Sequence, residues 1–169
     1  MPELTAAHER LKLAREQRGL THEALAAATG LPPASIADLE SYDDELTSNL
    51  SLTNLRALCG LLQLSPMALL LGAVPPMTAS PISLSELAIA LGRAHEASGL
   101  SVAQFSERVG WELKDVLTDP RAFGHFTVDG LRDVCAEAGV DWTAVLASLP
   151  AAESQAGPPV EISSLKRNN

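Results

Sequence analysis

Apolar and polar residues follow each other along this chain with the period of an amphipathic α-helix, in short stretches separated by Gly, Pro and Ser. In residues 52–63 the apolar positions are three or four apart, at Leu52, Leu55, Leu58, Cys59 and Leu62. Apolar residues at this spacing form one stripe along a helix, which must be buried against other helices. The pattern therefore predicts an all-α fold built from short helices.

Five helices are predicted in the first part of the chain, and their ends carry recognisable signals. Gly19 and Gly30 stop the first two helices, Thr21 caps the second, and Pro33 and Pro66 suit the first turns of the third and fifth. The predicted ranges are 5–18, 22–29, 33–41, 52–63 and 66–71.

Five more helices are predicted farther along. Ser83 with Glu86, and Ser101 with Gln104, have the spacing of capping boxes, in which two side chains satisfy the free amides of a helix start. Asp141 is the expected cap of the last helix. The predicted ranges are 84–98, 102–109, 112–118, 127–138 and 142–149.

The two sets of helices carry one pattern twice. Residues 20–36 align with residues 100–116 at an offset of 80, so that Leu20 falls on Leu100 and Gly30 on Gly110. Downstream the offset is 76, and Cys59 falls on Cys135. The four-residue difference lies between predicted helices, where insertions are tolerated. We interpret the pattern as a domain duplication.

This duplication predicts the domain organisation. A first five-helix domain covers residues 1–71 and a second covers 84–149. Residues 72–83 are rich in Pro and Ser and uncharged, as in a linker, and residues 150–169 are expected to be a flexible tail. Val160 and Ile162 would allow part of this tail to pack as an extended strand.

A helix, a tight turn at a glycine and a second helix make the geometry of a helix-turn-helix. Gly30 supplies the turn, because its backbone must adopt a conformation that side chains resist. Ala26 is small where the two helices would cross, and Ile36 and Leu39 would hold the inner face of the third helix. The outer face of that helix would be free to enter a DNA groove.

Residues 11–71 resemble the Cro/C1-type (XRE-type) helix-turn-helix family, through LKLAREQRGLTHEALAAATGLPPASIADLES followed by LTNLRALCGLLQLSPMALL. Residues 87–149 resemble the same family more faintly. The resemblance implies two tandem lambda-repressor-like domains of five helices, in which the third helix reads the major groove. Members of the family usually bind paired half-sites as dimers.

The resemblance, together with the basic residues of the first helix, indicates which residues of the first domain contact DNA. Those expected to contact phosphate are Arg10, Lys12, Arg15, Arg18, Thr21 and His22. Those expected to face bases in the groove are Pro33, Ala34, Ser35, Ala37 and Asp38. This second set has none of the Arg, Lys, Asn or Gln side chains that read guanine or adenine in bidentate fashion. Glu40 matches an acidic residue of the family and is expected to be structural.

The second copy has lost the cations of the first, since Arg10 falls on Ala90, Arg15 on His95 and Arg18 on Ser98. Apolar residues have appeared in their place or nearby. We therefore expect this copy to serve packing or dimerisation, with an interface that includes Ile89, Ala90 and Leu113.

The charge of the chain argues against a strong nucleic-acid binder. The net charge is −9, from 12 basic and 21 acidic residues. Four cationic contacts from the first helix are fewer than the ~6–10 phosphate contacts of a tight binder, so DNA binding should be modest and salt-sensitive. The acidic run Tyr42-Asp43-Asp44-Glu45 is either a solvated loop or a site for a basic partner.

No pattern in the sequence indicates catalysis, a cofactor or a metal site. The four His lie at no metal-ligand spacing, and neither a nucleophile elbow nor a phosphate-binding Gly-rich loop occurs. Cys59 and Cys135 lie in apolar helical stretches and are expected to be small core residues. The absence of an apolar span and of a signal-peptide pattern predicts a cytoplasmic protein.

Two functions follow from these observations. The first is a DNA-binding transcriptional regulator, in particular a repressor, which acts on double-stranded DNA as a homodimer through the N-terminal helix-turn-helix. The alternative is an acidic protein-interaction module on a helix-turn-helix frame, similar to an antitoxin or an anti-repressor. The sequence leaves open whether the two copies pair within one chain or between chains.

Overall fold

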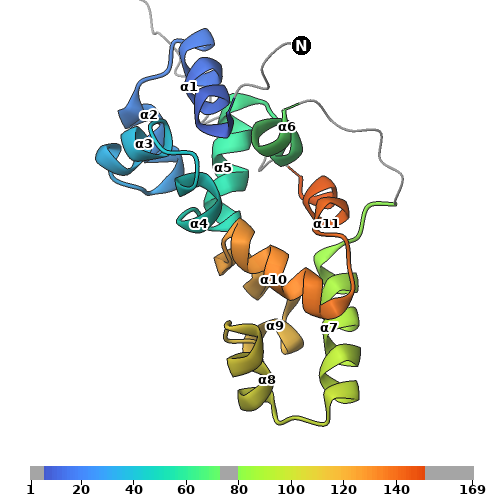
Figure 1. Ribbon diagram of the computed structural model, residues 1–169. Coiled ribbons are helices and arrows are strands. Elements are labelled where there is room, and N and C mark those ends of the chain that lie inside the picture. The colour runs from blue at the N-terminus through green and yellow to red at the C-terminus, as the bar shows by residue number, and fades with distance from the viewer. Residues whose placement is uncertain (1–5, 73–79, 151–169) are drawn as a thin grey trace, which may run out of the picture.

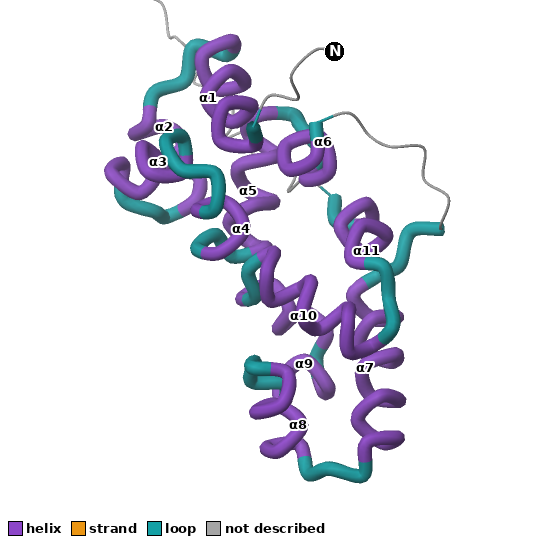
Figure 2. Tube along the Cα trace, in the orientation of Figure 1, coloured by secondary structure: helices purple, strands orange, loops and turns teal. Residues whose placement is uncertain are grey.

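The computed structural model describes residues 6–72 and 80–150, and their regular secondary structure is entirely helical (Figures 1 and 2). The N-terminal half contains α1 (Ala7–Gln17), α2 (His22–Thr29), α3 (Pro33–Leu39), α4 (Glu45–Ser48), α5 (Leu52–Leu62) and α6 (Pro66–Leu71). The C-terminal half contains α7 (Leu84–Ser98), α8 (Val102–Val109), α9 (Lys114–Thr118), the 3₁₀ helix η1 (Pro120–His125), α10 (Val128–Ala138) and α11 (Trp142–Ser148). The all-α prediction is confirmed.

The predicted local signals act as expected at the helix ends. The Thr21 hydroxyl accepts a hydrogen bond from the Ala24 amide, and Gly30 closes α2 with a left-handed φ of 72°. Both capping boxes form, at Ser83 with Glu86 and at Ser101 with Gln104. These interactions are local in sequence, which explains why the predicted bounds of α2, α7 and α8 agree with the structure.

Two short helices lie where the sequence predicted none. Helix α4 forms between α3 and α5, and η1 follows α9 after one residue. Each is held by one deeply buried side chain, Leu46 in α4 and Phe123 in η1. Helices of four and six residues are too short to be stable by themselves, so they depend on tertiary packing that the local pattern does not reveal.

The hydrophobic core runs without interruption through both halves. Leu11, Leu25 and Leu55 from the first half and Phe105 and Leu131 from the second half are fully buried members of one cluster. The two halves are therefore stabilised by each other and not only by their own helices. The free thiols of Cys59 and Cys135 are buried in the same core, and burial raises the pKa of each to about 12.

The two halves meet through three pairs of elements. Helix α4 packs on α10, η1 packs on α5, and α6 packs on α11. At the centre, Ser51 and Thr127 form an isolated antiparallel bridge, and the Leu52 amide donates to the Phe126 carbonyl at 2.7 Å. In Figure 1, α10 accordingly lies between the helices of the N-terminal half and those of the C-terminal half.

Some predicted boundaries lie outside the described residues. Most of the predicted linker (residues 73–79) and the predicted tail, with its potential strand, belong to this part of the chain. Among the helices that are described, none is both long and apolar enough to cross a lipid bilayer.

Gly130, in the first turn of α10, allows the Trp111 ring to lie against the helix backbone. A Cβ atom at Gly130 would lie 2.6 Å from the Trp111 ring, whereas a Cβ at Gly92 in α7 would have no neighbour within 4 Å. Trp111 also stacks on Phe126 and donates from Nε1 to Asp133 at 3.0 Å. A methyl group at position 130 would therefore displace a side chain that joins three elements.

We predict that Gly130→Ala destabilises the protein by about 1–3 kcal/mol relative to Gly92→Ala, because it overpacks the Trp111 contact. Gly92→Ala is the matched control, and it should be neutral or stabilise by up to about 1 kcal/mol through helix propensity. Urea unfolding followed by tryptophan fluorescence measures both. Equal stability of the two variants would contradict the packing described here.

Candidate nucleic-acid interface

Helices α2 and α3 and the turn between them form the candidate interface. The turn begins at Gly30, whose amide donates to the Ala26 carbonyl at 2.8 Å. Thr29 supports it, since its hydroxyl donates to the Leu25 carbonyl at 2.9 Å. On the inner side of the unit, Ala26 and Ile36 are buried. The backbone path and the inner face are therefore those of a rigid two-helix unit.

Glu40 follows the last residue of α3 and connects it to α1 and α2. Its carboxylate accepts two hydrogen bonds from Arg15, Nε to Oε1 at 2.5 Å and Nη2 to Oε2 at 2.8 Å. His22 Nε2 lies 3.0 Å from the same Oε2. The Glu40 side chain is only 5% exposed and that of Arg15 13%. We call these three residues, Arg15, His22 and Glu40, the Glu40 cluster.

The charges of the Glu40 cluster reinforce each other. Burial raises the pKa of the Glu40 carboxyl, but the hydrogen bonds and charges of Arg15 and His22 outweigh burial, and the net pKa lies below the ordinary value. The hydrogen bond with Glu40 raises the pKa of Arg15. Arg15 also donates from Nη1 to the Leu20 carbonyl at 3.0 Å. Its guanidinium is therefore used within the domain.

Arg10 is also used within the fold. Its Nε donates to the Leu69 carbonyl and its Nη2 to the Leu70 carbonyl, each at 2.7 Å. These bonds satisfy two carbonyl groups at the end of α6, where no helix amide is left to do so. Arg10 and Arg15 were both predicted to contact phosphate. Their phosphate contacts remain a prediction, and each would compete with these internal hydrogen bonds.

Lys12 in α1 and Arg18, the residue that caps the end of α1, are both exposed cations. Lys12 is solvent-exposed, and Arg18, also exposed, donates from Nη2 to the Gln63 side chain at 2.9 Å. Thr21 is exposed at the start of α2, with its hydroxyl oxygen accepting from the Ala24 amide. His22 is half-buried, with 35% of its side chain exposed next to Glu40.

The outer face of α3 is accessible to solvent. Pro33, Ala34 and Asp38 are exposed, and Ser35 and Ala37 are partly exposed. The structure thus brings together on one surface all five residues that the sequence predicted to face bases. The face carries one hydroxyl, several methyl and methylene groups and one carboxylate, which gives it little capacity for direct base recognition.

Comparison with known proteins agrees with this geometry. Residues 11–69 match the family model described as Helix-turn-helix. This segment is an XRE-type helix-turn-helix domain. It contains the whole Glu40 cluster and all of α2 to α5. The searches of curated proteins and of solved structures returned no match to the chain.

The C-terminal half does not reproduce the polar features of the helix-turn-helix domain. The positions of Arg15, His22 and Glu40 are taken by His95, Val102 and Pro120. Pro120 begins η1, and α9 has only five residues where α3 has seven. The Nε2 atom of His95 is buried without a hydrogen-bond partner among the described residues. This half therefore lacks the interaction that holds α3 in place.

The residues predicted to form an interface in the C-terminal half lie in different environments. Ile89 is 56% exposed and Ala90 is partly exposed, both on α7. Leu113 is completely buried in the core, because it precedes α9 on the side that packs against neighbouring helices. Leu113 thus supports the fold and cannot be reached by a second molecule while the half is folded.

Sequence analysis missed two features of this region. The Glu40 cluster was not foreseen, although Glu40 itself was expected to be structural, because Arg15 and Glu40 are separated by 25 residues. The contact of the two halves at Ser51 and Thr127 was also missed. The sequence did carry a hint of this contact, because Ser51 and Thr127 are both helix caps and are equivalent at the offset of 76.

Among the described residues no group of three potential ligands could hold a metal ion.

We predict that Glu40→Gln destabilises the protein by about 3 kcal/mol at neutral pH, because it leaves the buried Arg15 charge without its carboxylate. Since the folded pKa of Glu40 is lowered, its contribution is present above the ordinary pKa of about 4.3 and is lost as the pH falls below it. Denaturant unfolding of both proteins between neutral and acidic pH measures this difference, which should shrink toward low pH.

Glu107→Gln is the matched control, since Glu107 is exposed on α8. It should change stability by less than about 0.5 kcal/mol at any pH. A Glu40→Gln variant that behaves like Glu107→Gln would show that the cluster does not hold the domain together.

Proposed function

We propose that this protein is a transcriptional regulator, in the form of a repressor, that binds double-stranded DNA through α3 of its helix-turn-helix domain. The observation that carries the proposal is the solvent-exposed face of α3, presented by a helix unit that the Glu40 cluster holds rigidly. The match of residues 11–69 to the helix-turn-helix family supports it.

Contacts with DNA phosphates would come from exposed cations that precede α2 and from the first residues of α2. Lys12 and Arg18 are the cations free to turn toward DNA at small cost, since one is solvated and the other has a single exposed hydrogen bond. Thr21 and His22 lie at the start of α2, whose helix dipole favours an anion there. Because the whole chain carries a charge of −9, these contacts should give modest affinity that falls steeply with salt.

Sequence preference would rest on shape and on apolar contacts. Ala34 and Ala37 can contact thymine methyl groups, and Ser35 can exchange one hydrogen bond with a base edge. Asp38 can accept a hydrogen bond from a cytosine amino group, but its charge is repelled by the phosphates. We therefore expect discrimination to be weak and to follow the shape and flexibility of the DNA.

We predict that Lys12→Gln and Arg18→Gln each weaken binding to duplexes from the region upstream of the protein's own coding sequence. Each loss should be similar for all duplexes and should reduce the slope of log K against log salt by about 0.9. Lys114→Gln, which removes an exposed lysine of α9, is the control and should change neither quantity. Electrophoretic shifts over a salt series measure both. No shift by the unmodified protein at micromolar concentration and low salt would contradict the proposal.

A protein-interaction module is the second candidate function, and one observation favours it. Two of the four α1 cations, Arg10 and Arg15, are committed to internal hydrogen bonds, while acidic side chains at Asp43, Asp44 and Asp38 are exposed. Such a surface suits a basic protein partner.

This second candidate predicts that the tagged full chain captures one basic protein from a nuclease-treated extract. Capture should weaken when Asp43 and Asp44 are both replaced by Asn, because the attraction is electrostatic. Replacement of Glu107 by Gln and Asp115 by Asn, two exposed acids of the C-terminal half, is the matched control. Capture of no protein from the nuclease-treated extract, together with retention of nucleic acid from an untreated one, would decide in favour of the DNA-binding regulator.

A further inference from the structure

Equivalent positions of the two halves meet each other at their junction. With the offset of 76, Ser51 corresponds to Thr127, and these two residues form the antiparallel bridge. Each caps a long helix, Ser51 accepting from the Asn54 amide at the start of α5 and Thr127 from the Gly130 amide at the start of α10. In a two-fold arrangement only residues next to the axis can contact their own equivalents.

The remaining contacts across the junction occur in reciprocal pairs. The positions of α4 correspond to part of η1 and those of α5 to α10, so the packing of α4 on α10 is the counterpart of that of η1 on α5. Helix α6 corresponds to α11, and these two helices pack on each other. Such reciprocity is the mark of an isologous interface, which normally joins two identical chains.

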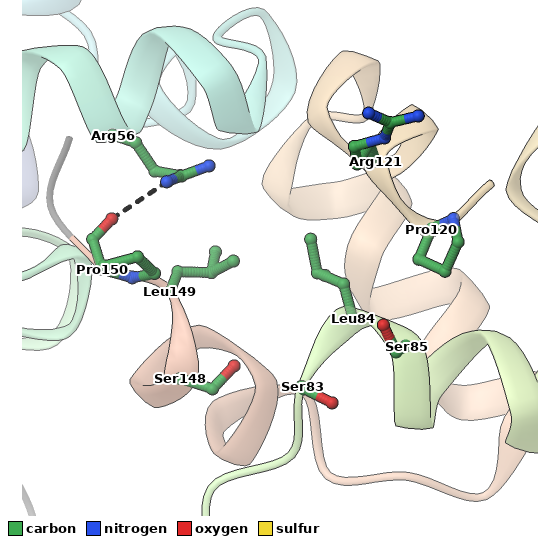
Figure 3. Close-up of a pocket in the computed structure, with 9 residues that line it drawn as sticks. All are labelled: Arg56, Ser83, Leu84, Ser85, Pro120, Arg121, Ser148, Leu149 and Pro150. Carbon is green, nitrogen blue, oxygen red and sulfur yellow. Dashed lines mark hydrogen bonds between the residues drawn. The ribbon is translucent and has the colours of Figure 1, made fainter.

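Two clefts lie beside the junction. Each is lined by one member of an equivalent pair of arginines, Arg56 in the first and Arg132 in the second. In the first, shown in Figure 3, the Arg56 side chain of α5 reaches toward the end of α11 and donates from Nε to the Pro150 carbonyl at 3.0 Å. In the second, Arg132 of α10, the equivalent of Arg56, lines a cleft together with Leu70 and Leu71 at the end of α6. The clefts measure about 230 and 510 Å³.

The junction is also closely packed. Leu50 and Leu52 next to Ser51, and Phe126 and Val128 next to Thr127, are all buried in the shared core. Thr53 donates from its hydroxyl to the Gly124 carbonyl at 2.9 Å across the two halves. A surface of this kind would expose apolar side chains if its partner were removed, so it requires permanent cover.

We propose that the C-terminal half takes the place of a second protomer, so that one chain is a complete pseudo-dimer with a single DNA-binding half. The surface around Ser51, α4 and α5 thereby has its partner within the same chain. Tethering makes this pairing intramolecular, with an effective concentration on the order of millimolar, so it prevails over pairing between chains. The resulting species is a monomer.

That only one half binds DNA rests on the proposed function, whereas the pairing of the two halves within one chain does not. The C-terminal half has a five-residue α9 and no counterpart of the α1 cations Arg10, Lys12, Arg15 and Arg18. One chain should therefore engage one half-site, and its binding site should be a single motif without two-fold symmetry. A pair of equal recognition helices would instead require two inverted half-sites about 34 Å apart.

The pairing is tested with the full chain carrying Ser51→Cys and Thr127→Cys. Opposed residues of an antiparallel pair have Cα atoms within about 5.5 Å, which suits a disulfide. The native thiols are buried and unreactive, so they can stay in place. After mild oxidation we expect an intramolecular disulfide, seen as a monomer of increased mobility on a non-reducing gel. Ser51→Cys with Ser101→Cys, a cap at the start of α8, is the control and should form no internal disulfide.

Disulfide-linked dimers of the Ser51→Cys/Thr127→Cys protein would overturn the proposal, because they would show that the halves pair between chains. Failure to form any disulfide would also overturn it. Light scattering of the unmodified protein at high micromolar concentration should give the mass of one chain, which keeps the test valid if the substituted caps impair folding. A dimer mass there would count against the proposal as well.

Selection of DNA from a random duplex library tests the prediction that one chain binds one half-site. A single asymmetric motif bound by one chain is expected. An inverted repeat bound by two chains would overturn the prediction of a single half-site. Retention of no duplex from the library at low salt, combined with the internal disulfide, would refute the DNA-binding function and leave the pseudo-dimer intact. The two proposals can thus fail separately.

Discussion

The ionic contact of Glu40 with Arg15 and His22 is the interaction on which the helix-turn-helix unit depends. Helix α3 has seven residues, too few to be stable or to keep a fixed orientation alone. Ile36 and Leu39 anchor its inner face, but apolar contacts do not define a direction as strictly as bidentate hydrogen bonds do. By joining the end of α3 to α1 and α2, Glu40 fixes the orientation of the exposed face of α3.

The use of arginines in internal contacts limits the positive charge of the surface. Arg15 neutralises Glu40, and Arg10 completes the end of α6, so two of the four cations on α1 serve the fold. In a chain with 21 acidic residues and 12 basic ones, few positive charges are left to attract a polyanion. The same residues thus stabilise a small domain and reduce the positive charge that its surface can offer to a polyanion.

The two halves reach stability by different means. The N-terminal half relies on the Glu40 cluster and aliphatic side chains, whereas the three Phe and two Trp residues of the chain all lie in the C-terminal half. Phe123, Phe126 and Trp111 form contacts near the junction, and Phe105 packs against the His95 ring. Aromatic packing needs no charged side chains, so a half that has no such ionic cluster can still be firmly packed.

The sequence by itself determined most of the helices, their caps and the accessible face of α3. These features depend on residues a few positions apart, such as Thr21 with Ala24 or Ser83 with Glu86, and local physics decides them. Tertiary structure alone decided that α4 and η1 form, that Arg15 turns inward to Glu40, and that Ser51 meets Thr127. Each of these involves groups far apart in the chain, and their free energy arises from burial and desolvation, which exist only once the helices have packed.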